Sequence, residues 1–158
     1  MAMVYGTIRS MKKGFTLLEL LVTISIIGIL LGVGAASFAT AQKRGRDSRR
    51  QSDMKSIQKA LEQCYAVDSS YPVSVTSGSA LTCTGAAVTM NQVPSDPKDD
   101  ATYSYASMYS VGVGNADYCL CALLENIGKG NASAMGSGGS CTFATGVGAD
   151  YFCTASQQ

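Results

Sequence analysis

The six cysteines are the residues best suited to chemistry in this chain of 158 residues, and all of them lie after residue 60. The chain has no histidine, which removes the commonest general base and the commonest metal ligand. Most nucleophile–base pairs and zinc hydrolase sites are excluded with it. No Walker loop, nucleophile elbow or dinucleotide-binding fingerprint occurs either. The sequence therefore predicts a protein that is not an enzyme and that uses no cofactor.

In an exported domain, six cysteines indicate three disulfides, for which fifteen pairings are possible. Cys119 and Cys121 share one face of a predicted strand, so a bond between them would be strained. We expect them to reach separate partners, Cys141 and Cys153, which leaves Cys64 with Cys83. A metal site at Cys119 and Cys121 is weak without histidine, so no metal is expected. Four aspartates could offer oxygen ligands to Ca²⁺, but no calcium loop pattern is present and turn formation is the favoured interpretation: Asp96, Asp99, Asp100 and Asp117.

An apolar run precedes the cysteines, over residues 15–41, and its only charge is Glu19. As a helix it would be about 40 Å long at about 1.5 Å per residue, which is enough to span a bilayer. A buried core helix is the alternative, but runs of this length are rare in a small soluble domain. We therefore expect a segment that inserts into a membrane.

Residues 42–67 are predicted to continue the same helix with one apolar face. Apolar side chains recur there at three- and four-residue steps, at Met54, Ile57, Leu61, Cys64 and Tyr65. No proline occurs before Pro72, so we expect one helix from about Phe15 to about Val67. Glycine costs about 1 kcal/mol relative to alanine inside a helix. The expected weak points are therefore Gly28, Gly32 and Gly34, with Gly45 further along.

Residues 68–158 predict a small β head. Side chains alternate from Tyr103 to Val113, which is typical of a strand. Residues 114–117 suggest a hairpin turn, and residues 117–125 a second strand with Cys119, Cys121 and Leu123 on one face. Residues 128–140 are rich in glycine and serine and predict a flexible loop, and a short last strand is expected near Asp150–Thr154. The predicted fold class is α+β: one long N-terminal helix packed on a small antiparallel sheet with disulfides.

The stretch MKKGFTLLELLVTISIIGILL, residues 11–31, resembles the N-terminus of type IV pilins and type II secretion pseudopilins. The matching residues are Lys12, Lys13, Gly14, Phe15 and Glu19. The resemblance implies that residues 1–14 are a prepilin leader, and that a prepilin peptidase cuts between Gly14 and Phe15 and methylates the new amine. An ordinary secretory signal has its apolar region before the cleavage site. Pilins often carry a proline midway along the apolar helix, which this chain lacks; the three glycines could serve instead.

The resemblance implies a structural subunit that polymerises into a type IV pilus-like surface filament, for adhesion, motility or DNA uptake. Glu19 would pair with the α-amino group of Phe15 on a neighbouring subunit. The implied partners are other copies in a helical homopolymer, the prepilin peptidase, and an inner-membrane platform with a cytoplasmic ATPase. The chain would be a single-pass membrane protein first and an extracellular filament subunit later. The alternatives are a major pseudopilin of a type II secretion system, a DNA-binding competence pilin and a plain membrane-anchored domain.

Charge is distributed unevenly along the chain. Residues 42–59 carry a net +5 and the residues after them a net −6. One hypothesis is DNA capture through phosphate contacts of Arg46, Arg49 and Arg50. The favoured interpretation is a helix face that pairs with acidic heads of neighbouring subunits. Asn131 begins a glycosylation acceptor pattern, which is a weak prediction because three-residue patterns arise often by chance.

Overall fold

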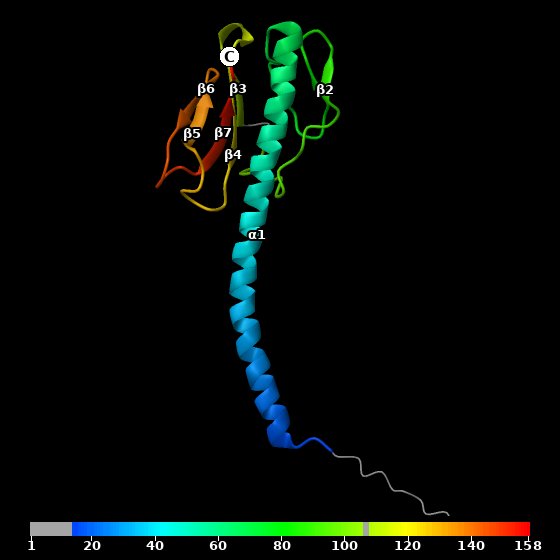
Figure 1. Ribbon diagram of the computed structural model, residues 1–158, viewed down its shortest axis with the longest axis vertical. Coiled ribbons are helices and arrows are strands. Elements are labelled where there is room, and N and C mark those ends of the chain that lie inside the picture. Colours follow the sequence, from blue (N-terminus) through cyan, green and yellow to red (C-terminus); the bar gives the residue numbers. More distant parts are fainter. Residues whose placement is uncertain (1–13, 106–107) are drawn as a thin grey trace, which may run out of the picture. The chain divides into compact units, whose positions relative to one another are not determined.

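The computed structural model describes residues 14–105 and 108–158 (Figure 1). The chain divides into two compact units, one ending at Ala39 and the other comprising Thr40–Gln158. Helix α1, Leu17–Asp68, is a single element of 52 residues that belongs to both units. The single long helix is therefore confirmed, and none of the glycines expected to weaken it interrupts it.

Helix α1 begins at a local signal. The Oγ1 atom of Thr16 accepts a hydrogen bond from the Glu19 backbone N–H at 3.1 Å, which satisfies one of the unpaired donors of the first turn. A threonine followed three residues later by glutamate is the pattern of a helix capping box. Gly14 and Phe15 precede the helix, so the bond between them lies outside it.

The first half of α1 presents apolar side chains to its surroundings on every face. Its most apolar stretch of 18 residues has a mean hydropathy of 2.4 and no buried residue. Such a helix is long and apolar enough to cross a membrane. Large aliphatic side chains left unburied here need lipid or another protein around them.

The second unit is built on the second half of α1. Strands β1 (Leu81–Thr82) and β2 (Val88–Met90) form a two-stranded antiparallel sheet. A five-stranded antiparallel sheet has the order β3-β4-β7-β5-β6 and lies on the other side of the helix in Figure 1. Its strands are β3 (Tyr109–Val111), β4 (Tyr118–Leu123), β5 (Ala132–Ser137), β6 (Ser140–Phe143) and β7 (Tyr151–Ala155). A short 3₁₀ turn, η2 (Val113–Asn115), joins β3 to β4. The predicted α+β class is confirmed.

Strand β4 is buried on both faces, which makes it the centre of the head. Its residues Tyr118, Leu120 and Ala122 pack against the helix face of Met54, Ile57, Leu61 and Cys64. On its other face, Cys119 and Cys121 pack with Met108, Ala132 and Cys153. The predicted helix stripe and the predicted β4 face are thus both observed.

Two expectations about the head are wrong. The first strand is only Tyr109–Val111, because Tyr105 is buried in the core and donates its hydroxyl to Asp53 at 3.0 Å. Residues 128–140 are not a flexible loop, since they contain β5 and the start of β6. Small residues are required there by close backbone packing: a Cβ at Gly130 would collide with the Tyr151 carbonyl, and one at Gly136 with the Ser140 carbonyl.

Candidate functional site

The residues expected to direct processing and assembly lie together at the start of the helix. Gly14 and Phe15 are exposed, and no atom lies within 4 Å of the position of a Gly14 Cβ. Glu19 is exposed in the first turn of α1 and is the only acidic residue of that turn. The structure thus leaves Gly14, Phe15 and Glu19 exposed.

A buried ion cluster joins the helix to the head. Arg50 is 0% exposed. Its guanidinium donates to both carboxylate oxygens of Asp96, at 2.6 and 2.9 Å, to Asp47 at 2.8 Å and to Glu125 at 3.0 Å. It also lies 4.4 Å from the ring centroid of Tyr103. One fully buried cation therefore holds three carboxylates that are far apart in the sequence.

The same cluster fixes the loop that follows β4. Arg46 binds Glu125 through two parallel hydrogen bonds of 2.6 and 2.7 Å. The Arg46 hydrogen bond is the largest factor that lowers the pKa of Glu125, from 4.5 to about 2. Asp47 accepts the backbone N–H groups of Glu125 and Asn126, at 2.9 and 3.0 Å. The Glu125 carboxylate therefore stays charged at any physiological pH.

This arrangement corrects the expectation for DNA binding. Arg50 is inaccessible to a phosphate, and Arg46 is already paired with Glu125. Of the three arginines, only Arg49 is largely exposed, with 64% of its side chain accessible and a long contact of 3.8 Å to Asp53. The sequence pattern Asp47-x-x-Arg50 was the available signal, since residues three apart face each other on a helix. No pattern in the sequence indicated the distant partners Asp96 and Glu125.

A second set of polar contacts joins the helix to the opposite end of the head. Glu62 accepts the hydroxyls of Tyr71 and Tyr118, at 3.0 and 3.1 Å. Burial is the largest factor that raises the pKa of both tyrosines, and the nearby Glu62 charge raises it further. The two rings meet edge to face, 4.7 Å apart. Helix α1 is thus attached to β4 near both ends of that strand.

The three disulfides are Cys64–Cys83, Cys119–Cys141 and Cys121–Cys153. Cys119 and Cys121 do take separate partners, as the sequence predicted. The last four of these sulfur atoms lie within 4.8 Å of one another, because the two disulfides are adjacent. As disulfides they offer no thiolate to a metal.

The remaining sequence candidates are occupied by contacts within the chain. The Asn131 side chain bonds both backbone groups of Cys153: its Nδ2 donates to the carbonyl at 2.9 Å and its Oδ1 accepts the N–H at 2.7 Å. A glycan on Nδ2 would disrupt this pair, so the structure argues against the glycosylation site. Asp100 accepts two backbone N–H groups of its own turn, which agrees with a turn-forming role. Asp96 is instead paired with Arg50, and Asp117 accepts the hydroxyl of the distant Ser156.

Comparison with known proteins agrees with the N-terminal motif. The model of the prokaryotic N-terminal methylation motif matches residues 9–35. Curated relatives named type IV major fimbrial protein FimA, from Dichelobacter nodosus, are 36% identical over 56 residues, which is 35% of this chain. The chain matches only about a third of the length of these relatives, 36% and 35% respectively. No solved structure matches significantly.

The likeness is thus confined to part of the chain. The N-terminal part of the chain carries the methylation motif and is similar to type IV fimbrial proteins. The structure has the long helix and antiparallel head with three disulfides that the sequence led us to expect.

Proposed function

We propose that this chain is the structural subunit of a type IV pilus-like surface filament. The observation that carries the proposal is the exposed apolar half of α1, whose only charge is Glu19 in the first turn. Side chains of this kind can be buried in a membrane or against identical helices. Other copies of the chain would supply those helices, and head-to-tail contacts of this type build an open helical polymer.

Glu19 would set the register of that polymer. A carboxylate at the centre of a membrane helix costs about 2.5–3.5 kcal/mol on insertion scales, so it usually has a partner. The partner in this proposal is the α-amino group of Phe15 on a neighbouring copy, freed when the prepilin peptidase removes residues 1–14. The exposed Gly14–Phe15 bond and the exposed Glu19 carboxylate are compatible with both steps. An inner-membrane platform and its ATPase would drive extension.

The subunit would be a single-pass membrane protein first and part of an extracellular filament afterwards. It would act as a building block and not as an enzyme, in keeping with a family of structural subunits. The relatives carry the name major fimbrial protein, which favours a pilus over a secretion pseudopilus. A DNA-uptake pilin is less favoured, because Arg50 is buried and Arg46 is paired within the chain.

The test is the intact mass and N-terminal sequence of material sheared from the cell surface. We expect a chain that begins at N-methylated Phe15 and is six hydrogens lighter than the reduced form, two for each of three disulfides. A chain that retains Met1 or Met11, or no shed protein at all, contradicts a processed surface filament. Short periplasmic fibres without surface filaments would indicate the pseudopilin instead.

A further inference from the structure

Two loops form one end of the head, next to the point where α1 enters the second unit. They are residues 124–131, between β4 and β5, and residues 144–150, between β6 and β7; we call them the basal loops. The first is bound to Asp47 through the backbone of Glu125 and Asn126. The second contacts the first, since Asp150 accepts the Gly128 N–H at 2.8 Å. Both loops are therefore held near the helix turn that contains Asp47.

Each basal loop carries an aliphatic side chain that the fold leaves outside. Ile127 is 77% exposed and Val147 is fully exposed, at 105% of its reference value. The two loops approach each other closely at Gly128 and Gly146, since a Cβ at Gly128 would lie 3.2 Å from the Gly146 carbonyl. Ile127 and Val147 are the chain neighbours of these two glycines. These side chains contribute nothing to the core and project from the same end of the head.

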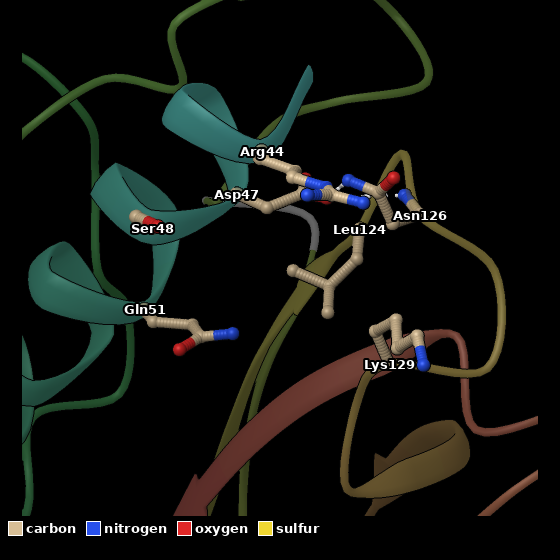
Figure 2. Close-up of a pocket in the computed structure, with 7 residues that line it drawn as sticks. All are labelled: Arg44, Asp47, Ser48, Gln51, Leu124, Asn126 and Lys129. Atoms are coloured by element: carbon tan, nitrogen blue, oxygen red, sulfur yellow. Dashed lines mark hydrogen bonds between the residues drawn. The ribbon is translucent and has the colours of Figure 1, made fainter. Parts of the chain in front are cut away.

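Cationic side chains line a pocket next to the first basal loop. Arg44 and Lys129 line a pocket of about 360 Å³ at this end, together with Asp47, Ser48, Gln51, Leu124 and Asn126 (Figure 2). The Asp47 carboxylate is already paired with the buried Arg50. Within residues 14–105 and 108–158, no carboxylate lies within ion-pair distance of Arg44, Lys129 or the neighbouring Lys43. The basal loops contain two carboxylates, and both are engaged: Glu125 by two arginines and Asp150 by Gly128. The surface is therefore positive.

Only a short stretch of chain separates the end of the apolar run from the residues that hold this surface. Arg44 is three residues and Asp47 six residues after Ala41, where that run ends. Six residues of helix measure about 9 Å at about 1.5 Å per residue. The headgroup region of one leaflet is about 5–8 Å thick, taking about 30 Å for the hydrocarbon core and about 40–45 Å for the whole bilayer. If residues 15–41 span a membrane and Ala41 lies at the edge of the hydrocarbon core, the turn that holds the basal loops lies at the outer edge of the headgroup region.

We propose that the basal loops dock on the outer face of the membrane before assembly. Ile127 and Val147 insert at the level of the headgroups, and Arg44, Lys43 and Lys129 bind the phosphates of anionic phospholipids. Apolar insertion combined with attraction to anionic lipid is how interfacial segments bind. The pocket between Arg44 and Lys129 suits a phosphate-bearing headgroup. This inference rests on the membrane stage of the proposed function.

The absence of tryptophan from the chain allows a direct test. The variant Ile127→Trp places one fluorophore at a basal loop, and Val113→Trp places one in η2, at the opposite end of β4, where Val113 is also fully exposed. The full-length chain is reconstituted in vesicles of phosphatidylglycerol and phosphatidylethanolamine, or of phosphatidylcholine alone. Flotation first establishes that each variant inserts, so failure of the membrane stage is seen separately.

In the anionic vesicles, Ile127→Trp should emit at shorter wavelength and be quenched by lipids brominated near the headgroup, whereas Val113→Trp should be unaffected. Phosphatidylcholine, or the added changes Arg44→Gln and Lys129→Gln, should remove most of the quenching. Equal emission from the two tryptophan variants would overturn the proposal. Quenching of the same size in anionic and in phosphatidylcholine vesicles would also overturn it. An emission shift that grows with the ratio of protein to lipid would overturn it too, because it would indicate a second copy at this surface.

Discussion

At the scale of single residues, Arg50 is the side chain on which the attachment of helix to head depends most. It is fully buried and binds Asp47, Asp96 and Glu125. Removing one partner of a buried ion pair usually costs about 3–5 kcal/mol, because an uncompensated charge remains. Here three carboxylates would lose their shared cation. Arg50 therefore serves the stability of the fold and is not available as a surface cation.

We predict that Arg50→Ala lowers the free energy of unfolding of the head by about 3–5 kcal/mol. The matched control is Arg49→Ala, whose side chain is 64% exposed and should change stability by no more than about 0.5 kcal/mol. Urea unfolding of the full chain in detergent, followed by near-ultraviolet circular dichroism of the tyrosines, measures both. Equal losses in the two variants would show that the buried cluster adds nothing.

Glu125 adds a pH dependence at the same scale. Its pKa is about 2 in the folded chain, against 4.5 when unperturbed. A lowered pKa contributes stability that is complete above the unperturbed value and is lost as the pH falls through the folded one. We therefore predict that unfolding becomes easier between about pH 4.5 and 2, as urea midpoints across that range would show. Glu125→Gln should flatten this part of the profile; an unchanged slope would assign the acid sensitivity to other carboxylates.

At the scale of elements, the β5–β6 hairpin requires glycine at a position where there is no room for a side chain. A Cβ at Gly136 would collide with the Ser140 carbonyl and lie 2.8 Å from the Cys119 sulfur. Overpacking of this kind costs about 1–3 kcal/mol or more. Gly136→Ala should therefore lower the thermal midpoint of the head. Gly45→Ala is the control, because Gly45 is an exposed helix residue with open space around it, and the change should raise stability by about 0.5–1 kcal/mol.

Elements differ in how far they could be predicted from sequence. The long helix and β4 carry periodic apolar patterns, so both were predictable. Strand geometry also predicted that Cys119 and Cys121 take separate partners, but not which of Cys141 and Cys153 each one binds. Strands β5 and β6 were missed because the glycines and serines that suggest a flexible loop are what close backbone packing requires. The Arg50 cluster was missed because its pairs join residues 46 and 75 positions apart. No local pattern records such contacts.

At the scale of the whole molecule, assembly should depend on one carboxylate. We predict that Glu19→Ala leaves the head folded and the protein in the membrane, since neutralising this charge eases insertion. Surface filaments should be lost or sharply reduced, as counted by electron microscopy and by the amount of sheared protein. Leu18→Ala, one position away on the exposed apolar helix, is the control and should retain filaments. Normal filaments from Glu19→Ala would remove the proposed register contact.

The two attachments between α1 and β4 have a mechanical consequence. The helix is bound to one end of the strand through Arg46 and Arg50 and to the other through Glu62, and β4 lies along the helix within the second unit (Figure 1). Tension applied along the helix therefore loads the contacts of β4 in shear, so that they resist together. A force that peeled the strand sideways would break them one after another. A filament built from such subunits would carry tension along its α1 helices while each head stays folded.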